Sequence, residues 1–194
     1  MNLILTLLLL VLTTPLAAEP ADHEVAIFAG GCFWCMEPPY DETEGVISTT
    51  SGFIGGHVDN PSYREVVSGG TGHTEAVKVV YDPGRVSYEE LLHIFWRNID
   101  PVAVDRQFCD VGPMYRSGIF YLDDEQRRLA RESRDELADS GRFDQPIATE
   151  ITEAGTFWEA EEYHQGYYQK NPVRYRYYRW RCGRDQRLEA IWGD

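Results

Sequence analysis

Two cysteines three positions apart are the residues of this sequence best suited to chemistry. Cys32 and Cys35 enclose Phe33 and Trp34 and follow two glycines. An apolar stretch over residues 24–29 predicts a buried strand before the glycines, and a helix is expected to begin near Cys35. Cys32 would then lie at a helix N-terminus, where free N–H groups stabilise a thiolate. The spacing therefore predicts a nucleophilic thiol at position 32 beside an apolar aromatic wall.

The other two cysteines, Cys109 and Cys182, leave further interpretations open. Four thiols could form two structural disulfides in a secreted domain. A structural zinc site would need close ligand pairs, which neither residue offers, so no metal is expected. A CxxC pair between a strand and a helix also occurs in thioredoxin-like proteins, although these usually place an aromatic residue before the first cysteine. A thiol-disulfide oxidoreductase is therefore the main alternative, and a secreted disulfide-stabilised binding domain is the non-enzymatic one.

Strands and helices alternate along the chain around these residues. Strands are predicted over 24–29, 46–54, 73–81, 117–122 and 147–151, helices over 62–67, 87–99, 123–140 and 159–170, and irregular structure over 100–116. Ser87 with Glu90 has the spacing of a capping box. The sequence has neither a Rossmann-type glycine fingerprint nor an internal repeat. We expect an α+β fold, a ferredoxin-like two-layer α/β sandwich with a mixed sheet and an irregular C-terminal tail.

The first eighteen residues have the pattern of an export signal. An apolar run over residues 3–12 is followed by small residues, and the first charged side chain is Glu19. The run is shorter than the roughly 20 apolar residues that a helix needs to span a bilayer. We expect a signal peptide over 1–18, one catalytic domain over 19–194 and no stable membrane anchor. The mature protein is expected to be exported, either periplasmic or secreted, into an oxidising compartment.

The charge balance argues against nucleic acid as a partner. The chain has 18 Lys and Arg against 32 Asp and Glu, a formal net charge of -14, which repels phosphate backbones and anionic lipid surfaces. A basic, aromatic stretch over residues 174–187 is the exception. We expect this stretch to pack over the rest of the protein, with its arginines paired to nearby carboxylates.

Several separate motifs resemble those of one enzyme family and occur in that family's order. They are GCFW at 31–34, GG at 55–56, NPSY at 60–63, GHTEAV at 72–77, DVGPMYRS at 110–117, YHQ at 163–165 and NP at 171–172. Together they resemble the A-type peptide methionine sulfoxide reductases, from about residue 25 to residue 172. The resemblance implies reduction of the S epimer of methionine sulfoxide, free or in proteins, without a cofactor.

The resemblance implies a catalytic role for five matching side chains. Cys32 attacks the sulfoxide sulfur, and Glu75 gives a proton to the departing oxygen. Tyr63 and Tyr115 donate hydrogen bonds to that oxygen, and Asp110 orients the site. Glu75 can donate a proton at neutral pH only if its pKa is raised, so burial of this carboxyl is expected.

The resemblance also implies how the substrate is held and what its reduction leaves behind. Phe33 and Trp34 hold the S-methyl group of the substrate. His73 and His164 receive no chemical role and are expected to be structural. Release of methionine leaves Cys32 as a sulfenic acid, which a second thiol must resolve.

The sequence departs from the family pattern at the position of that second thiol. Many members have glycine after the tryptophan, where this chain has Cys35, which could attack the sulfenic acid directly. Other members use a cysteine in a flexible tail, and here Cys182 is the tail candidate, with Cys109 or an external thiol as further options. A bridge between Cys109 and Cys182 is a separate hypothesis. The enzyme is expected to be a monomer that a thioredoxin-like donor reduces.

Overall fold

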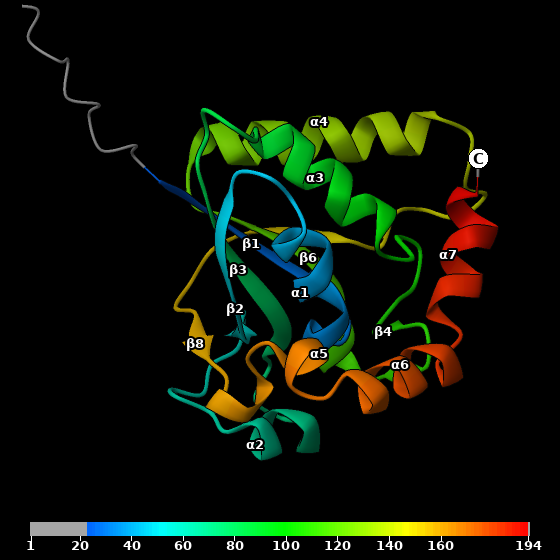
Figure 1. Ribbon diagram of the computed structural model, residues 1–194. Coiled ribbons are helices and arrows are strands. Elements are labelled where there is room, and N and C mark those ends of the chain that lie inside the picture. Colours follow the sequence, from blue (N-terminus) through cyan, green and yellow to red (C-terminus); the bar gives the residue numbers. More distant parts are fainter. Residues whose placement is uncertain (1–22, 194) are drawn as a thin grey trace, which may run out of the picture.

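The computed structural model describes residues 23–193, in which helices pack against a mixed β-sheet (Figure 1). The predicted signal peptide, residues 1–18, lies outside the described residues. Within residues 23–193, no helix has the length and apolar character needed to cross a membrane.

The secondary-structure elements follow one another in an order close to the predicted one. They are β1 (Glu24–Gly30), α1 (Phe33–Asp41), β2 (Val46–Ile54), α2 (Tyr63–Ser68), β3 (Thr74–Tyr81), α3 (Tyr88–Arg97), β4 (Arg106–Gln107), β5 (Asp110–Val111), the 3-10 turn η1 (Pro113–Tyr115), β6 (Ser117–Tyr121), α4 (Asp124–Asp139), β7 (Glu150–Glu153), β8 (Trp158–Glu159), the 3-10 turn η2 (Glu162–His164), α5 (Tyr167–Lys170), α6 (Pro172–Arg181) and α7 (Arg184–Trp192).

Six strands form the main sheet in the order β7-β6-β1-β3-β2-β8. Neighbouring strands are antiparallel, except that β6 and β7 are parallel. The inner strands β6-β1-β3-β2, with α1 after β1 and α3 after β3, have the ferredoxin-like β-α-β-β-α-β arrangement. This confirms the predicted two-layer sandwich with a mixed sheet.

The two faces of the sheet are covered differently. One face packs against α1, α3 and α4, in a core that contains Phe28 and Leu92. Because side chains alternate along a strand, Ile27 and Ala29 of β1 point to the other face, where they pack with Phe120. Figure 1 shows α3 and α4 side by side on the helical face, with α1 beside them over the centre of the sheet.

Capping boxes fix the starts of two helices. At α3 the Ser87 side chain accepts from the Glu90 N–H and the Glu90 carboxylate accepts from the Ser87 N–H, as predicted. Ser62 and Glu65 repeat this arrangement at α2. The second box makes Tyr63 the first residue of its helix, which fixes the backbone of a candidate site residue.

The predicted start of α1 is wrong by two residues. The helix begins at Phe33 rather than near Cys35, so Pro38 and Pro39 lie inside it instead of in its first turn. Proline has no N–H, so the carbonyls four residues earlier, those of Trp34 and Cys35, receive no helical hydrogen bond from them. The carbonyl oxygens of Trp34 and Cys35, close to the predicted nucleophile, are therefore left outside the regular helical hydrogen bonding.

Two predictions for the C-terminal part are also wrong. The helix predicted over 159–170 is replaced by β8, η2 and α5, because Gly166 adopts a left-handed conformation with φ 56° that interrupts helical geometry. The tail predicted to be irregular forms α6 and α7. Its helices are stabilised by burial of Tyr175, Ile191 and Trp192 against the rest of the protein, which local sequence patterns do not reveal.

Candidate active site

Cys32 lies between the end of β1 and the first residue of α1, where the sequence predicts it. Its side chain is 6 % exposed. The preceding Gly31 has φ 80°, and a β-carbon there would lie 2.5 Å from the Cβ of Gln107. The Gln107 amide in turn pairs with the backbone N–H and carbonyl of Asp100, at 2.8 Å each. Glycine is therefore required at position 31 to bring Cys32 against the rigid β4 segment.

Glu75 is the buried acid of the site. It projects from β3, its side chain is 1 % exposed, and its Oε2 accepts a hydrogen bond of 3.0 Å from the backbone N–H of Phe33. Burial raises the pKa of Glu75 well above its usual value, and the charge of Asp110 raises it further, although the hydrogen bond from Phe33 opposes both effects. The expected burial and raised pKa of Glu75 are both found, and burial favours the protonated form of the carboxyl.

The electrostatics of the two thiols correct the expectation that the helix N-terminus activates Cys32. Burial, hydrogen bonding to Cys35 and the charge of Glu75 all raise the pKa of Cys32. The first N–H of α1 is bonded to Glu75 and cannot serve the thiolate. Hydrogen bonding from Cys32 lowers the pKa of Cys35 to about 6 against the effect of burial, with help from Arg184 and Arg179. Hydrogen bonding within the pair therefore favours the thiolate at Cys35 over the thiolate at Cys32.

Tyr63 and Tyr115 bring two phenol groups to the same place from α2 and η1. The backbone N–H of Tyr63 is fixed by the Glu161 carboxylate at 3.1 and 3.3 Å. Burial raises the pKa of both phenols, and the charges of Glu75 and Cys32 raise it further. Both hydroxyls therefore stay neutral and can donate hydrogen bonds beside the thiol and the acid.

An aromatic wall borders the thiol pair. Trp34 stacks on Tyr167 with ring centroids 3.7 Å apart, and its indole Nε1 donates to Nδ1 of His164 at 3.1 Å. The ring of Phe33 lies 5.1 Å from that of His164. Burial lowers the pKa of His164, which keeps its imidazole neutral and able to accept the indole N–H. The two predicted substrate-binding aromatics are thus brought together, and His164 holds one of them in place.

His73, the other histidine expected to be structural, is held by the loop around it. Its Nδ1 accepts from the Gly56 N–H at 3.1 Å, and its Nε2 lies 2.8 Å from the Val58 carbonyl oxygen. Both ring nitrogens are therefore engaged by backbone groups.

Asp110 joins the site through a residue that the sequence analysis missed. Its Oδ2 accepts a hydrogen bond of 2.5 Å from the hydroxyl of Tyr178 in α6. The Tyr178 ring also meets Trp34 edge-on, at 5.9 Å between centroids. Burial raises the pKa of Asp110, whereas the Tyr178 hydrogen bond and the charge of Arg184 lower it. No local pattern marks Tyr178, because it lies in a run of aromatic and basic residues.

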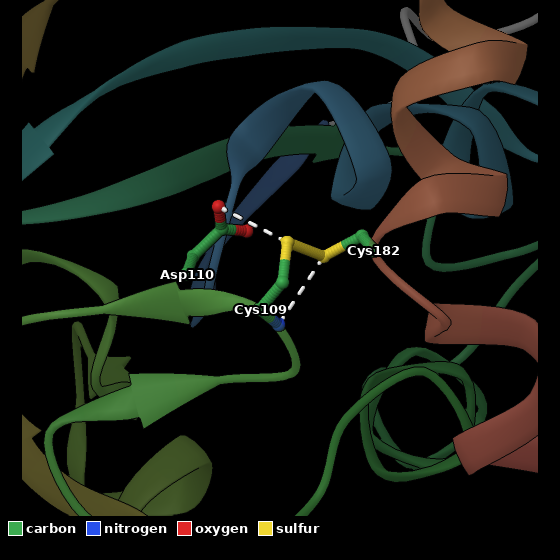
Figure 2. A group of neighbouring side chains, drawn as sticks. All are labelled: Cys109, Asp110 and Cys182. Carbon is green, nitrogen blue, oxygen red and sulfur yellow. Dashed lines mark hydrogen bonds between the residues drawn. A yellow bond between two sulfur atoms is a disulfide. The ribbon is translucent and has the colours of Figure 1, made fainter.

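The remaining cysteines form a disulfide next to Asp110. Cys109 and Cys182 are bonded to each other, whereas Cys32 and Cys35 are free and buried. Figure 2 shows Asp110 beside this disulfide, at the point where the β5 segment meets the C-terminal part of the chain. The hypothesis of a bridge between Cys109 and Cys182 is confirmed. The bridge fastens the end of α6 to the strand that carries Asp110.

Arg184, at the start of α7, is a second residue that the sequence analysis missed. Its side chain is 1 % exposed, and its Nη2 donates to the carbonyls of Asn98 at 2.7 Å and Gly30 at 3.3 Å. Its guanidinium carbon lies 4.4 Å from the ring centroid of Phe108. A buried cation therefore lies behind the loop that carries the thiols and lowers the pKa of Cys35. The sequence predicts only that the stretch over residues 174–187, which contains Arg184, packs over the rest of the protein.

These groups define a cysteine-dependent oxidoreductase, with two thiols, a buried acid and neutral phenols placed to protonate and reduce a small polar group. The sequence model of the family described as peptide methionine sulfoxide reductase matches residues 24–194. The chain belongs to this family, and it is an oxidoreductase that reduces methionine sulfoxide.

Curated relatives carry the same description over most of their length. The peptide methionine sulfoxide reductase MsrA of Bacillus licheniformis is 52% identical over 171 residues, which cover 88% of this chain and 94% of the relative. The MsrA of Ligilactobacillus salivarius is 57% identical over 152 residues, 78% of this chain and 88% of the relative.

Solved structures give the same result for the fold. Mxr1 from Saccharomyces cerevisiae in reduced form has a TM-score of 0.72 and 32% identity, covering 80% of this chain and 89% of that one. Methionine sulfoxide reductase A of Corynebacterium diphtheriae has a TM-score of 0.69 and 36% identity. The match covers 81% of this chain and 79% of that one. Mxr1 in complex with Trx2 is also similar, with a TM-score of 0.52 and 25% identity, covering 79% and 90%.

Proposed function

We propose that the enzyme reduces the S epimer of methionine sulfoxide, free or in proteins, and that Cys32 is its nucleophile. The observation that carries this proposal is the hydrogen bond between Glu75 and the backbone N–H of Phe33, which fixes a buried acid, with its pKa raised by burial, beside the thiol. Glu75 gives its proton to the sulfoxide oxygen while the Cys32 sulfur bonds to the sulfoxide sulfur. The neutral hydroxyls of Tyr63 and Tyr115 donate to the same oxygen as it gains charge.

Cys32 must lose a proton to attack, and Cys35 is placed to take it. The hydrogen bond between the two thiols raises the pKa of Cys32 and lowers that of Cys35, with Cys32 as the donor. The Cys32 proton passes to Cys35 as the Cys32 sulfur bonds to the sulfoxide sulfur. The oxygen, now a hydroxyl, moves from the methionine sulfur to the Cys32 sulfur as the bond between the two sulfurs breaks, so methionine leaves and Cys32 is left as a sulfenic acid.

Cys35 is also the resolving thiol in this proposal. Its sulfur attacks the Cys32 sulfenic acid, water leaves, and a Cys32–Cys35 disulfide forms. Two observations support this assignment: both residues are free and belong to the start of α1, whereas Cys182 is already bonded to Cys109. Resolution by Cys182 would first require reduction of its existing bond.

A thioredoxin-like dithiol reduces the Cys32–Cys35 disulfide and closes the cycle. The solved complex of the similar Mxr1 with Trx2 supports this choice of donor. Exchange of thiols with the donor returns both cysteines to their reduced state and leaves the donor oxidised.

The enzyme acts as an exported monomer in this proposal. The apolar segment before Glu19 and the Cys109–Cys182 disulfide both fit an oxidising compartment. N-terminal sequencing of protein exported by a Gram-negative host should find a start near Glu19, and a start at Met1 would contradict export by cleavage. Sedimentation should give the mass of one chain.

The test of the proposed activity is steady-state reduction of the separated S and R epimers of a blocked methionine sulfoxide, with dithiothreitol as donor. The wild type should reduce the S epimer only, and Cys32→Ser should be inactive. The control is the Cys109→Ser/Cys182→Ser double variant, which should keep turnover. If folded, reduced wild-type protein turned over neither epimer, the proposal would fail, and an insulin-reduction assay would then test the thiol-disulfide oxidoreductase alternative.

A further inference from the structure

Helix α6 exposes three arginines that pair with no carboxylate of residues 23–193. The helix has arginine at four positions and no acidic residue, in a chain of net charge -14. Arg179 pairs with Asp185. Arg174, Arg176 and Arg181 are exposed, and no carboxylate among residues 23–193 pairs with them. The expectation that the arginines of residues 174–187 pair with carboxylates therefore holds for Arg179 and Arg187 and is wrong for these three.

Two of the three arginines flank a residue of the active site. Residues three or four apart are neighbours on a helix surface, so Arg174 and Arg181 lie on either side of Tyr178. Tyr178 donates to Asp110 and packs edge-on against Trp34. Arg176 is two residues from Tyr178 and therefore points to another side of the helix. Arg174 and Arg181 are therefore the neighbours of Tyr178 on the surface of α6, whereas Arg176 is not.

Exposed aromatic side chains accompany these arginines. Tyr177 is 59 % exposed and Trp180 is 65 % exposed, with ring centroids 6.1 Å apart. Tyr177 is three residues after Arg174 and four before Arg181, so it shares their side of the helix, whereas Trp180 is four residues after Arg176 and lies nearer to that residue. Aromatic and arginine side chains that are both exposed and adjacent are typical of surfaces that bind polypeptides.

We propose that α6 binds the polypeptide around the methionine sulfoxide, and that Arg174 and Arg181 select substrates with acidic side chains near that residue. This inference rests on the proposed function and names its substrate class. The two arginines are seven residues apart, about 10 Å along a helix. An extended peptide covers that distance in about three residues. Two carboxylates close to one methionine sulfoxide can therefore reach both arginines while the sulfoxide meets Trp34.

The net negative charge of the protein confines the attraction for acidic peptides to α6. A surface of net charge -14 repels acidic peptides elsewhere, so α6 is where such a peptide gains favourable contacts. A free methionine sulfoxide reaches the aromatic wall without reaching the arginines. The preference should therefore appear with peptides and depend on the residues around the oxidised methionine.

The experiment compares kcat/KM for three blocked peptides in which S-methionine sulfoxide is flanked by Asp, by Ala or by Lys. Dithiothreitol is the donor, so no protein reductant takes part. The readout is the ratio of kcat/KM for the Asp peptide to that for the Lys peptide within one variant, which cancels effects on the chemical step. Arg174→Glu and Arg181→Glu should each lower this ratio by about two- to fivefold, as expected for exposed ion pairs. The matched control Arg176→Glu should leave the ratio near that of the wild type.

Every outcome of this comparison decides the proposal. It is supported if the wild type prefers the Asp peptide, if the preference shrinks with added salt and if only the two flanking arginines control it. It is overturned if the wild type has the same kcat/KM for all three peptides. It is equally overturned if Arg176→Glu lowers the ratio as much as Arg174→Glu and Arg181→Glu do. It is also overturned if Arg174→Glu and Arg181→Glu leave the ratio unchanged. Failure of the proposed activity can be told apart from failure of this proposal. In the first case the enzyme would not reduce even the blocked amino acid methionine sulfoxide.

Discussion

The carboxyl of Glu75 and the backbone N–H of Phe33 are joined by a hydrogen bond of 3.0 Å, which links the centre of the sheet to the first residue after the nucleophile. The bond crosses 42 residues of sequence and joins β3 to α1. It places an acid whose pKa is raised by burial against the turn that carries Cys32. The proton donor and the nucleophile therefore have a fixed geometry before substrate binds.

Replacing Glu75 by Gln should separate hydrogen bonding from proton donation. The amide oxygen can still accept from the Phe33 N–H, but the side chain can no longer act as an acid. We expect kcat to fall by about 10²- to 10⁴-fold, the usual contribution of general acid catalysis, with a much smaller change in KM. Steady-state kinetics on the S epimer would measure both values. An unchanged kcat would show that another group supplies the proton.

The raised pKa of Glu75 should also make stability depend on pH. Its folded-state pKa lies above its unfolded value, so its favourable contribution is complete below the unfolded pKa and is lost as pH rises through the folded pKa. Glu75→Gln has no such ionisation, so its Tm relative to the wild type should increase as pH rises. Thermal unfolding across acidic to alkaline pH checks this, and a Tm difference independent of pH would contradict it.

Replacing Arg184 by Met should raise the pKa of Cys35. The buried guanidinium lowers that pKa to about 6 together with the Cys32 hydrogen bond and Arg179, and methionine keeps most of the volume without the charge. The thiolate absorbance of the reduced protein should then appear at higher pH, and alkylation near pH 6 should slow. Arg187→Met is the matched control, because Arg187 pairs with Asp100 instead. Equal titration curves for the two variants would refute the effect.

The Cys109–Cys182 disulfide should stabilise the fold without taking part in turnover. It closes a loop with a sequence separation of 73 residues, and a bridge of this kind contributes about 2–4 kcal/mol by restricting the unfolded chain. The Cys109→Ser/Cys182→Ser variant should therefore unfold at lower denaturant concentration than the oxidised wild type. Loss of turnover in the folded double variant would contradict a purely structural bridge.

Local signals in the sequence predicted much of the fold and the centre of the site. The strand before the glycine pair, the Ser87–Glu90 capping box and the position of Cys32 at a helix start depend on neighbouring residues, and the structure contains all three. The raised pKa of Glu75 was also predictable, because the proposed chemistry requires it. These features can be predicted because the residues that cause them are close in sequence, or because the proposed reaction requires them.

The parts that could not be predicted depend on contacts between distant segments. Arg184 reaches the Gly30 carbonyl across 154 residues, and Tyr178 reaches Asp110 across 68. The helix-terminus argument for a thiolate at Cys32 failed for the same reason, because burial and neighbouring groups outweigh the local dipole. The C-terminal helices form through packing on the rest of the protein, which no local period in their sequence indicates.

A single turnover without reductant tests the central claim most directly. The reduced enzyme would be mixed with each epimer of a blocked methionine sulfoxide, the methionine released would be quantified, and the protein's disulfides would be mapped by peptide mass spectrometry. The account predicts one methionine per enzyme from the S epimer, together with a new Cys32–Cys35 disulfide and an unchanged Cys109–Cys182 bridge. Methionine from the R epimer, or Cys32 found bonded to Cys182, would contradict it.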